Sequence, residues 1–322
     1  MNFKGADILS IDQFEKADIA EIFSVAAAME VYAQRKKVTR VLEGAVLGNL
    51  FFEPSTRSRV SFETAFYRLG GAVTNISDPM STSMIKGESL EDTARVMGGY
   101  ADVLVVRHPQ EGAVKRCAEA TATPVINGGD GPGEHPTQAL LDLYTIMKEC
   151  GRGIDQIDGL SITMVGDLKH GRTVHSLAKL LSLFKKIHFT LVAPEPLKMP
   201  EEILDQISSR GHTIKQCDDL AHGISKAEVI YMTRLQEERF PSAEEAERYR
   251  GRYALNKGLY QKHVGSRWVP ILHPLPRDSR PGAREIDQDL DDHPALAIFR
   301  QAENGIPLRM ALFALVLDVC PF

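Results

Sequence analysis

Apolar and polar positions follow one another along the chain in a pattern that predicts strands and helices in turn. Short apolar runs typical of buried strands span residues 45–52, 72–76, 103–106, 124–126, 161–165, 188–192, 229–232 and 269–272. Helical periodicity fills most of the gaps between these runs. Because parallel strands are buried on both faces and are joined by helices, this alternation predicts an α/β protein with parallel sheets flanked by helices.

Three helices can be delimited by the residues at their ends. Ser10 and Gln13 form a capping-box signal, which predicts a first helix over residues 11–35. A proline at the start and a glycine beyond the end predict a helix over residues 136–150, which we expect to bridge two domains. The apolar run over residues 306–319 predicts a final helix, but the pattern does not indicate what that helix packs on.

Length and composition limit the class of protein. A chain of 322 residues is longer than one hydrophobic core usually serves, so two domains are expected. An apolar fraction of 43% and a charged fraction of 25% are typical of a soluble globular protein. The net charge of −5 argues against nucleic acid or a membrane as the main partner, because those partners require an extended basic surface.

The cysteines and the N-terminal residues favour a reducing, cytoplasmic location. The four cysteines form no CxxC pair and have no histidine at ligand spacing, so neither a zinc site nor a disulfide framework is expected. The N-terminal residues lack a basic segment followed by an apolar run, and no apolar stretch reaches about 18 residues. We therefore expect neither secretion nor insertion into a membrane.

The segment FFEPSTRSRVSFE carries the strongest signal for a binding site. An apolar strand ends there, and after a proline turn a helix begins with Ser55, Thr56, Arg57 and Ser58. A helix N-terminus offers unpaired N–H groups and a positive dipole end, so added hydroxyl and guanidinium groups favour a phosphate dianion. The structural alternative is that Ser55 only caps the helix and the arginine lies on a solvated surface.

Polar residues also follow other predicted strands of the N-terminal half. The loop STSMIKGES contains Ser83 and Lys86, and Arg107 follows the third strand. In GEHPTQALLD, His135 precedes the helix and Gln138 lies one turn along the same face. Ligands of open α/β sheets bind beyond the carboxyl ends of strands, so these residues are candidates for one site. Alone, the lysine is more simply an ordinary loop residue, and the histidine is equally well a satisfied buried residue.

The C-terminal half repeats this arrangement. GDLKHGRTVHS places Arg172 and Thr173 at a helix start, Arg234 and Gln236 follow the strand over residues 229–232, and HPLPR follows the last strand. The glycines of the first segment lack the GxGxxG spacing, so a dinucleotide site is weakly supported. The arginines have structural alternatives too, since Arg172 could cap a neighbouring helix and Arg234 could pair with a nearby glutamate. In an acidic protein, a positive field is predicted where these cations converge: Arg57, Lys86, Arg107, Arg172 and Arg234.

Together these segments resemble the aspartate/ornithine carbamoyltransferase family, and within it the aspartate branch. The resemblance spans nearly the whole chain and rests, in order, on FFEPSTRSRVSFE, STSMIKGESLEDT, RHPQEGA, GEHPTQALLD, GDLKHGRTVHS, YMTRLQEERF, HPLPR and FRQAENGIPLRMALFALVL. It implies transfer of the carbamoyl group from carbamoyl phosphate to the amino group of L-aspartate, giving N-carbamoyl-L-aspartate and phosphate. This is an early step of pyrimidine biosynthesis, and no metal or cofactor is implied.

The resemblance also implies a domain organisation and an assembly. Residues 1–142 with 298–322 would form a carbamoyl-phosphate-binding domain, to which the last helix returns, and residues 143–297 an aspartate-binding domain. The implied assembly is a homotrimer with active sites shared between subunits. Regulatory subunits or other enzymes of the pathway are candidate further partners.

Site residues follow motif by motif from the resemblance. The implied carbamoyl-phosphate-binding residues are Ser55, Thr56, Arg57, Ser58, Ser83, Lys86, Arg107, His135 and Gln138. The implied aspartate-binding residues are Lys86, Arg172, Thr173, Arg234, Gln236 and the carbonyl groups of Pro274 and Leu275. The implied catalytic residues are Arg57, Lys86, Arg107 and His135. Ser83 and Lys86 would act in the site of the neighbouring subunit.

Three departures and two rival functions accompany this resemblance. Ser58 stands where the family has threonine, and the spacing from Ser83 to Lys86 is shorter than in some members, so Ser83 is assigned by the preceding threonine. The segment over residues 278–294 is longer than usual, with no role that the sequence indicates. An ornithine carbamoyltransferase would have HCLP in place of HPLPR and would lack the KGE lysine loop. A non-catalytic homologue would have lost site residues, and none is lost.

Overall fold

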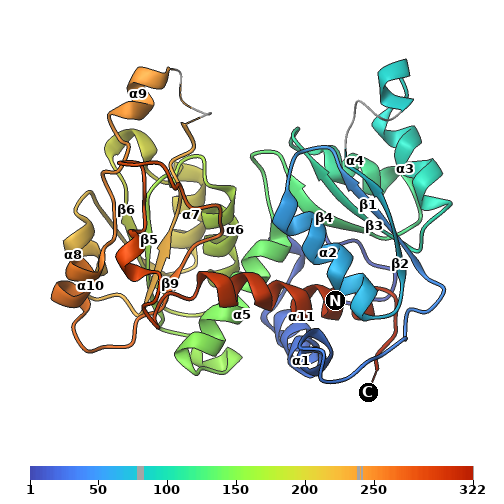
Figure 1. Cartoon of the computed structure of the whole chain (residues 1–322), viewed down its shortest axis with the longest axis horizontal. Coiled ribbons are helices and arrows are strands. Elements are labelled where there is room, and N and C mark those ends of the chain that lie inside the picture. Colours follow the sequence, from blue (N-terminus) through green and yellow to red (C-terminus); the bar gives the residue numbers. More distant parts are fainter. Residues whose placement is uncertain (78–82, 238–239, 241, 322) are drawn as a thin grey trace. The chain divides into compact units, whose positions relative to one another are not determined.

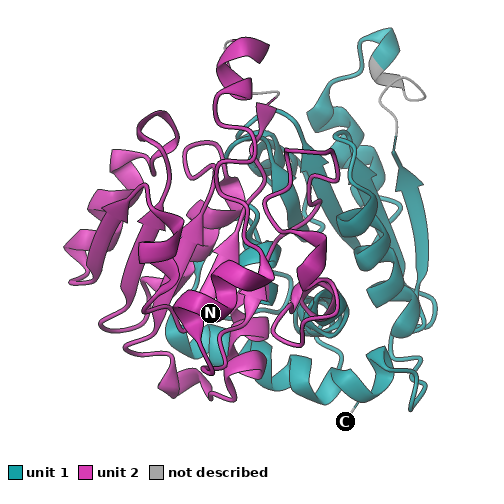
Figure 2. Ribbon diagram, turned by 60° about the vertical axis from the view of Figure 1, so that its left-hand side comes forward, with its two compact units in different colours: residues 1–141, 303–322 teal, residues 142–302 magenta. Residues whose placement is uncertain are grey.

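The computed structural model describes residues 1–77, 83–237, 240 and 242–321. The chain divides into two compact units, coloured separately in Figure 2: residues 1–141 with 303–322, and residues 142–302. The chain passes from the first unit to the second within one helix, α5 (Pro136–Cys150), and returns within another, α11 (Ile298–Val316). Each unit has its own parallel sheet.

The first unit has a four-stranded sheet in the order β2-β1-β3-β4. Its strands, all parallel, are β1 (Val46–Phe51), β2 (Ala72–Ile76), β3 (Val103–His108) and β4 (Val125–Asp130). The leucines of β1 and the leucine and valines of β3 are fully buried beneath helices such as α2 and α4 (Figure 1), which is why these inner strands are predicted as apolar runs.

The second unit has a five-stranded sheet in the order β7-β6-β5-β8-β9. Its strands, also all parallel, are β5 (Ser161–Val165), β6 (His188–Val192), β7 (Thr213–Cys217), β8 (Val229–Met232) and β9 (Ile271–Leu272). The predicted α/β class with parallel, helix-flanked sheets is therefore confirmed in both units.

Helices cover both sheets (Figure 1). Besides α5 and α11, the α-helices are α1 (Lys16–Ala33), α2 (Thr56–Arg68), α3 (Leu90–Gly98), α4 (Ala113–Ala120), α6 (Arg172–Leu181), α7 (Glu201–Ser209), α8 (Leu220–Ile224), α9 (Ala243–Glu247) and α10 (Lys257–Val264). Short 3₁₀ helices are η1 (Ile11–Gln13), η3 (Ser83–Lys86), η4 (Ile154–Gln156), η5 (Glu195–Leu197) and η7 (Gln288–Leu290).

Two helix boundaries differ from the sequence prediction. The capping box of Ser10 and Gln13 is present, but it caps η1, and the long helix begins only after an extended Phe14. The final helix begins eight residues earlier than predicted and continues through Pro307. Gly305 in that helix makes room for a cation, because an added Cβ would lie 2.5 Å from the Arg309 guanidinium. The glycine and proline therefore mark packing, not the end of a helix.

Helix α11 packs in the first unit against α2. The Phe313 ring lies 5.0 Å from that of Phe66 and 6.0 Å from that of Phe62, measured between centroids. The buried Arg309 donates a hydrogen bond of 2.7 Å to Ser61 Oγ and lies over the Phe62 ring. These contacts confirm that the last helix returns to the first domain, and they hold α2 in place.

Replacing Asp142 by alanine is expected to lower the free energy of unfolding of the second unit by about 2–4 kcal/mol. The buried Asp142 carboxylate accepts hydrogen bonds of 2.6 Å from the Tyr231 hydroxyl and from Gln301 Nε2, and both of these buried hydrogen bonds would be lost. Burial, together with this carboxylate, raises the pKa of Tyr231 well above its usual value.

The chain's single tryptophan, Trp268, lies in the second unit, so its fluorescence during urea denaturation would measure this change. The exposed Asp205 is the matched control, and Asp205→Ala should stay within about 0.5 kcal/mol of the wild type. Equal stability of Asp142→Ala and Asp205→Ala would contradict the proposed role of the buried carboxylate.

Candidate active site

In the first unit, two central strands end side by side. Phe51 is paired with Arg107 in the register of β1 and β3, and the Phe52 N–H donates to the Arg107 carbonyl at 2.8 Å. The connection after β1 leads directly into α2. The motif at the start of α2 and the side chain of Arg107 are therefore positioned by the same edge of the sheet.

The N-terminus of α2 has hydroxyl groups and an uncompensated cation. Ser55 occupies the N-cap position with extended backbone, but its side chain makes no capping hydrogen bond. Thr56 and Arg57 are exposed, and no ion pair links Arg57 to a residue that the structure describes. Neighbouring atoms partly desolvate the guanidinium and lower its pKa, yet an arginine remains charged at neutral pH. This end of α2 has the features of an anion site.

Arg107 is buried and held on two sides. Its guanidinium forms an ion pair of 2.9 Å with Glu53 and donates a hydrogen bond of 3.2 Å to the Gly128 carbonyl. Gly129 has a φ of +131°, and an added Cβ there would lie 2.8 Å from Arg107 Nη1. The glycine thus allows the guanidinium to lie directly against the end of β4.

His135 lies beside the first turn of α2. It is 3% exposed, and its Nε2 atom lies 3.4 Å from Ser58 Oγ. The first turn of α5 places Gln138 after it, with the Gln138 N–H donating to the His135 carbonyl at 3.0 Å. The structure therefore brings together a hydroxyl of one motif and the imidazole of another, 77 residues apart.

Asn127 is a supporting residue that the sequence did not single out. Its Oδ1 accepts a hydrogen bond of 2.7 Å from the Gly129 N–H, and its Nδ2 donates to the Leu9 carbonyl at 2.8 Å. These bonds shape the loop between β4 and His135. Its position directly after the predicted strand over residues 124–126 was the available signal, but the sequence does not indicate its hydrogen-bond partners.

The lysine loop lies partly outside the described residues. Ser81 and Thr82 fall in that part, whereas Ser83 opens η3 and Lys86 ends it. Lys86 is exposed, and no ion pair joins it to any residue in the described part of the chain. Within the first unit, its ammonium group is therefore available to an external anion.

In the second unit, three adjacent strands end beside one another. Val165 of β5 pairs with Met232 of β8, and Tyr231 of β8 pairs with Leu272 of β9. The residues predicted for a second site follow these three strands and are half-buried: Arg172, Thr173, Arg234, Gln236, Pro274 and Leu275. The sheet therefore gathers them at one edge, as expected for ligand-binding residues of a parallel sheet.

Asp167 connects two of these strand ends, although the sequence interpretation did not select it. The carboxylate is fully buried, and it accepts hydrogen bonds from the His170 N–H at 3.0 Å and the Gln236 N–H at 3.3 Å. A carboxylate directly after β5 was a visible signal. Its partner in the loop after β8 could not be read from the sequence.

The HPLPR turn has an unusual backbone. Leu275 has a φ of +59°, which is uncommon for a branched residue and is found most often at functional sites. Its N–H donates to His273 Nδ1 at 2.8 Å, and His273 Nε2 lies 2.7 Å from the buried Glu285 carboxylate. The buried His273 ring thus lies between the backbone of the turn and the Glu285 carboxylate.

The long segment after HPLPR has a structural role. Its C-terminal part contributes Ile286 and Leu290 to the core of the second unit, and Ile286 bridges to Leu255. Glu285 accepts from the Asp278 N–H at 3.2 Å with each carboxylate oxygen. The segment is thereby anchored at both ends.

The described residues also bear on two other classes of site. No three histidine, cysteine or carboxylate side chains gather there as a metal-binding group. None of the described helices combines the length and apolar character needed to cross a bilayer.

The chain is similar to known proteins along nearly its whole length. Residues 6–148 match the family model "Aspartate/ornithine carbamoyltransferase, carbamoyl-P binding domain", and residues 158–316 match "Aspartate/ornithine carbamoyltransferase, Asp/Orn binding domain". The aspartate carbamoyltransferase catalytic subunit of Cellvibrio japonicus is 60% identical over 322 residues, covering 99% of this chain and 94% of the relative. That of Saccharophagus degradans is 58% identical over 319 residues, with the same coverage of 99% and 94%.

A solved structure extends this similarity to the fold. The aspartate transcarbamoylase of Trypanosoma cruzi, in complex with carbamoyl aspartate and phosphate, matches with a TM-score of 0.89 at 38% identity. The match covers 98% of this chain and 97% of that chain.

Proposed function

The chain belongs to the aspartate/ornithine carbamoyltransferase family, and we propose that it is the enzyme that carbamoylates L-aspartate. It transfers the carbamoyl group of carbamoyl phosphate to the aspartate amino group and releases N-carbamoyl-L-aspartate and phosphate, a step of pyrimidine biosynthesis. The observation that carries this assignment is the 60% identity, over 99% of the chain, to a relative named as an aspartate carbamoyltransferase catalytic subunit.

Two domains, whose bounds lie within a few residues of those of the two units, divide the substrates between them. Residues 1–142 with 298–322 bind carbamoyl phosphate, and residues 143–297 bind aspartate. The two matched family models support this division, because one is named for carbamoyl phosphate and the other for aspartate or ornithine.

Carbamoyl phosphate binds at the N-terminus of α2. Backbone N–H groups, the hydroxyls of Ser55, Thr56 and Ser58, and the Arg57 guanidinium hold the phosphate. The carbamoyl oxygen faces Arg57, Arg107 and His135, while Gln138 holds the carbamoyl amide. Ser83 and Lys86 add contacts from the loop at η3.

Aspartate binds at the strand ends of the second unit. Arg172, supported by Thr173, takes the α-carboxylate, and Arg234 with Gln236 takes the side-chain carboxylate. Arginine suits both positions because its planar fork donates two hydrogen bonds to one carboxylate. The carbonyl groups of Pro274 and Leu275 orient the amino group, and Lys86 contributes charge.

The reaction needs orientation and fixed positive charge. The neutral amine of aspartate attacks the carbamoyl carbon, a tetrahedral oxyanion forms, and the carbon–oxygen bond to phosphate breaks. Positioning two reactants can contribute about 7–11 kcal/mol, and one oxyanion donor about 3–4 kcal/mol. Arg57, Arg107 and His135 stabilise the oxyanion, and the departing phosphate accepts the proton of the amine.

A direct assay tests the substrate. Purified protein should carbamoylate aspartate in the presence of carbamoyl phosphate and should leave ornithine unreacted, as measured by formation of the ureido product with each amino acid. Arg234 and Gln236 favour an acceptor amino acid whose side chain ends in a carboxylate, as in aspartate, whereas the side chain of ornithine ends in an ammonium group. Faster reaction of ornithine, or reaction of neither amino acid, would refute the assignment.

The assembly and location are part of the same proposal. We infer a homotrimer in which Ser83 and Lys86 complete the active site of the neighbouring subunit, in the cytoplasm. The exposed, uncompensated ammonium group of Lys86 supports this inference. Mass measurement of the native assembly would give the number of subunits and reveal any regulatory subunits or pathway enzymes that co-purify.

A further inference from the structure

We infer that Arg280, in the long segment after HPLPR, is a positioning residue for aspartate: it holds Glu237 and thereby the adjacent loop that carries Arg234 and Gln236. This inference rests on the proposed function of those two residues. All the groups involved lie in the second unit.

Glu237 is the centre of an ion-pair network. Its carboxylate accepts two hydrogen bonds from Arg250, of 2.9 and 3.0 Å, and two from Arg280, of 2.7 and 3.1 Å. These two guanidiniums lower the pKa of Glu237 to about 2, so the carboxylate stays ionised at neutral pH. Two bidentate partners fix the orientation of one carboxylate far better than a single surface pair does.

Arg280 is itself anchored to the buried part of the unit. Its side chain contacts the Asp278 carboxylate at 3.0 and 3.1 Å, and its N–H donates to the same group at 2.9 Å. The Asp278 N–H donates to Glu285, which is buried and contacts the buried His273. A continuous set of contacts thus runs from the HPLPR turn to Glu237.

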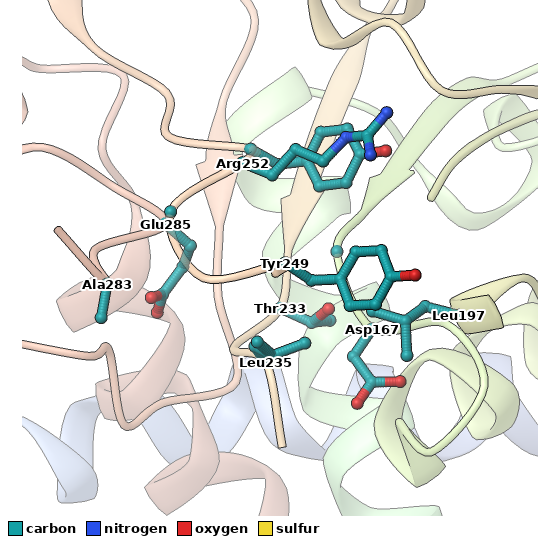
Figure 3. A pocket seen from close by; sticks show the side chains of 11 residues that line it. Asp167, Leu197, Thr233, Leu235, Tyr249, Arg252, Ala283 and Glu285 are labelled. Carbon is teal, nitrogen blue, oxygen red and sulfur yellow. The ribbon is translucent and has the colours of Figure 1, made fainter. Parts of the chain in front are cut away.

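A small cavity lies beside the network. Gly166, Asp167, Leu197 and three segments around residues 233–235, 249–253 and 283–285 line this cavity of about 30 Å³, and Figure 3 shows their side chains. Side chains therefore do not fill the space between these segments completely. The ion pairs of Glu237 with Arg250 and Arg280 lie in or next to the three segments and add a constraint on their positions.

Gln236 is therefore fixed from two sides. Its own N–H donates to the buried Asp167 at 3.3 Å, and the next residue is held by Arg250 and Arg280. Loss of Arg280 removes the link to the buried HPLPR turn and leaves Glu237 held by Arg250 alone. Aspartate then has to bind to a less ordered loop, which weakens binding without changing the reacting groups.

Arg280→Ala tests this inference in the full-length protein. The KM for aspartate should rise about tenfold or more, the size expected for one charge-assisted hydrogen-bonded contact. The kcat at saturating aspartate and the KM for carbamoyl phosphate should stay within about twofold. Hydrogen exchange of the loop at residues 234–237 should also become about tenfold faster, a readout that does not depend on activity.

Three variants make the result specific. Arg300→Ala is the matched control, because Arg300 also forms a bidentate pair, with Glu149, and its side chain is 45% exposed compared with 52% for Arg280. Arg300→Ala should change neither the KM for aspartate nor the rate of hydrogen exchange at residues 234–237. Arg280→Lys should be intermediate, and Glu237→Gln should reproduce the effect of Arg280→Ala with little further loss in the double variant.

The outcomes separate this inference from the proposed function. If Arg280→Ala changes neither the hydrogen exchange of residues 234–237 nor the KM for aspartate, the inference about Arg280 is wrong. Faster hydrogen exchange with an unchanged KM for aspartate, or a loss in kcat alone, would also overturn the inference. A wild-type protein that does not carbamoylate aspartate refutes the proposed function, whereas the exchange comparison still decides whether Arg280 orders the loop.

Discussion

Arg57→Ala is expected to lower kcat by about a thousandfold, because one preorganised cation that faces a developing oxyanion contributes roughly this much. The exposed Arg57 guanidinium lies at the N-terminus of α2, and no ion pair joins it to the described part of the protein. Its charge is therefore available to the substrate. Steady-state kinetics with both substrates saturating would measure the loss in kcat.

The loss in kcat should occur in a fully folded protein. Removal of an exposed side chain outside the core should change the free energy of unfolding by no more than about 0.5 kcal/mol. Arg68→Ala is the control, since Arg68 lies in the last turn of the same helix, and its kcat should equal that of the wild type. A kcat for Arg57→Ala close to the wild-type value would show that Arg57 does not stabilise the transition state.

Strands and the ends of strands were the predictable part of this molecule. Strands β2, β5, β6 and β8 have the predicted bounds. The strand β7 (Thr213–Cys217) was missed, because its sequence TIKQC is mostly polar and contains no apolar run. The edge strand β2 is equally exposed but was predicted, because its sequence AVTNI keeps more apolar residues, so an edge position does not by itself remove the signal.

The site residues are predictable as members of motifs, but their supporting contacts are not. Ser58 and His135 each stand in a recognisable motif, and the structure brings them within 3.4 Å. By contrast, the contacts of Asp167 with Gln236 and of Glu237 with Arg280 join residues 69 and 43 positions apart. Such pairings depend on the three-dimensional path of loops, for which a single sequence contains no periodic signal.

Mixing two inactive variants is expected to restore activity if the active sites are shared. Arg57→Ala lacks a residue of the phosphate motif, and Lys86→Ala lacks the exposed cation of η3. In hybrid trimers, a site that takes Arg57 from one subunit and Lys86 from its neighbour can have both residues intact. For equal amounts and random exchange, about one quarter of all sites would be complete.

The expected recovery is therefore from a residual rate to about one quarter of the wild-type rate, a change of more than a hundredfold over either variant. The mixture should be unfolded and refolded together, with one variant carrying a charge tag so that chromatography resolves the hybrids by composition. Each variant refolded alone is the control and should stay inactive. Separated hybrids of either mixed composition should each hold one complete site, because one neighbouring pair has the required order. If the hybrids are isolated and still have only the residual rate, Lys86 acts within its own subunit and the shared site is disproved.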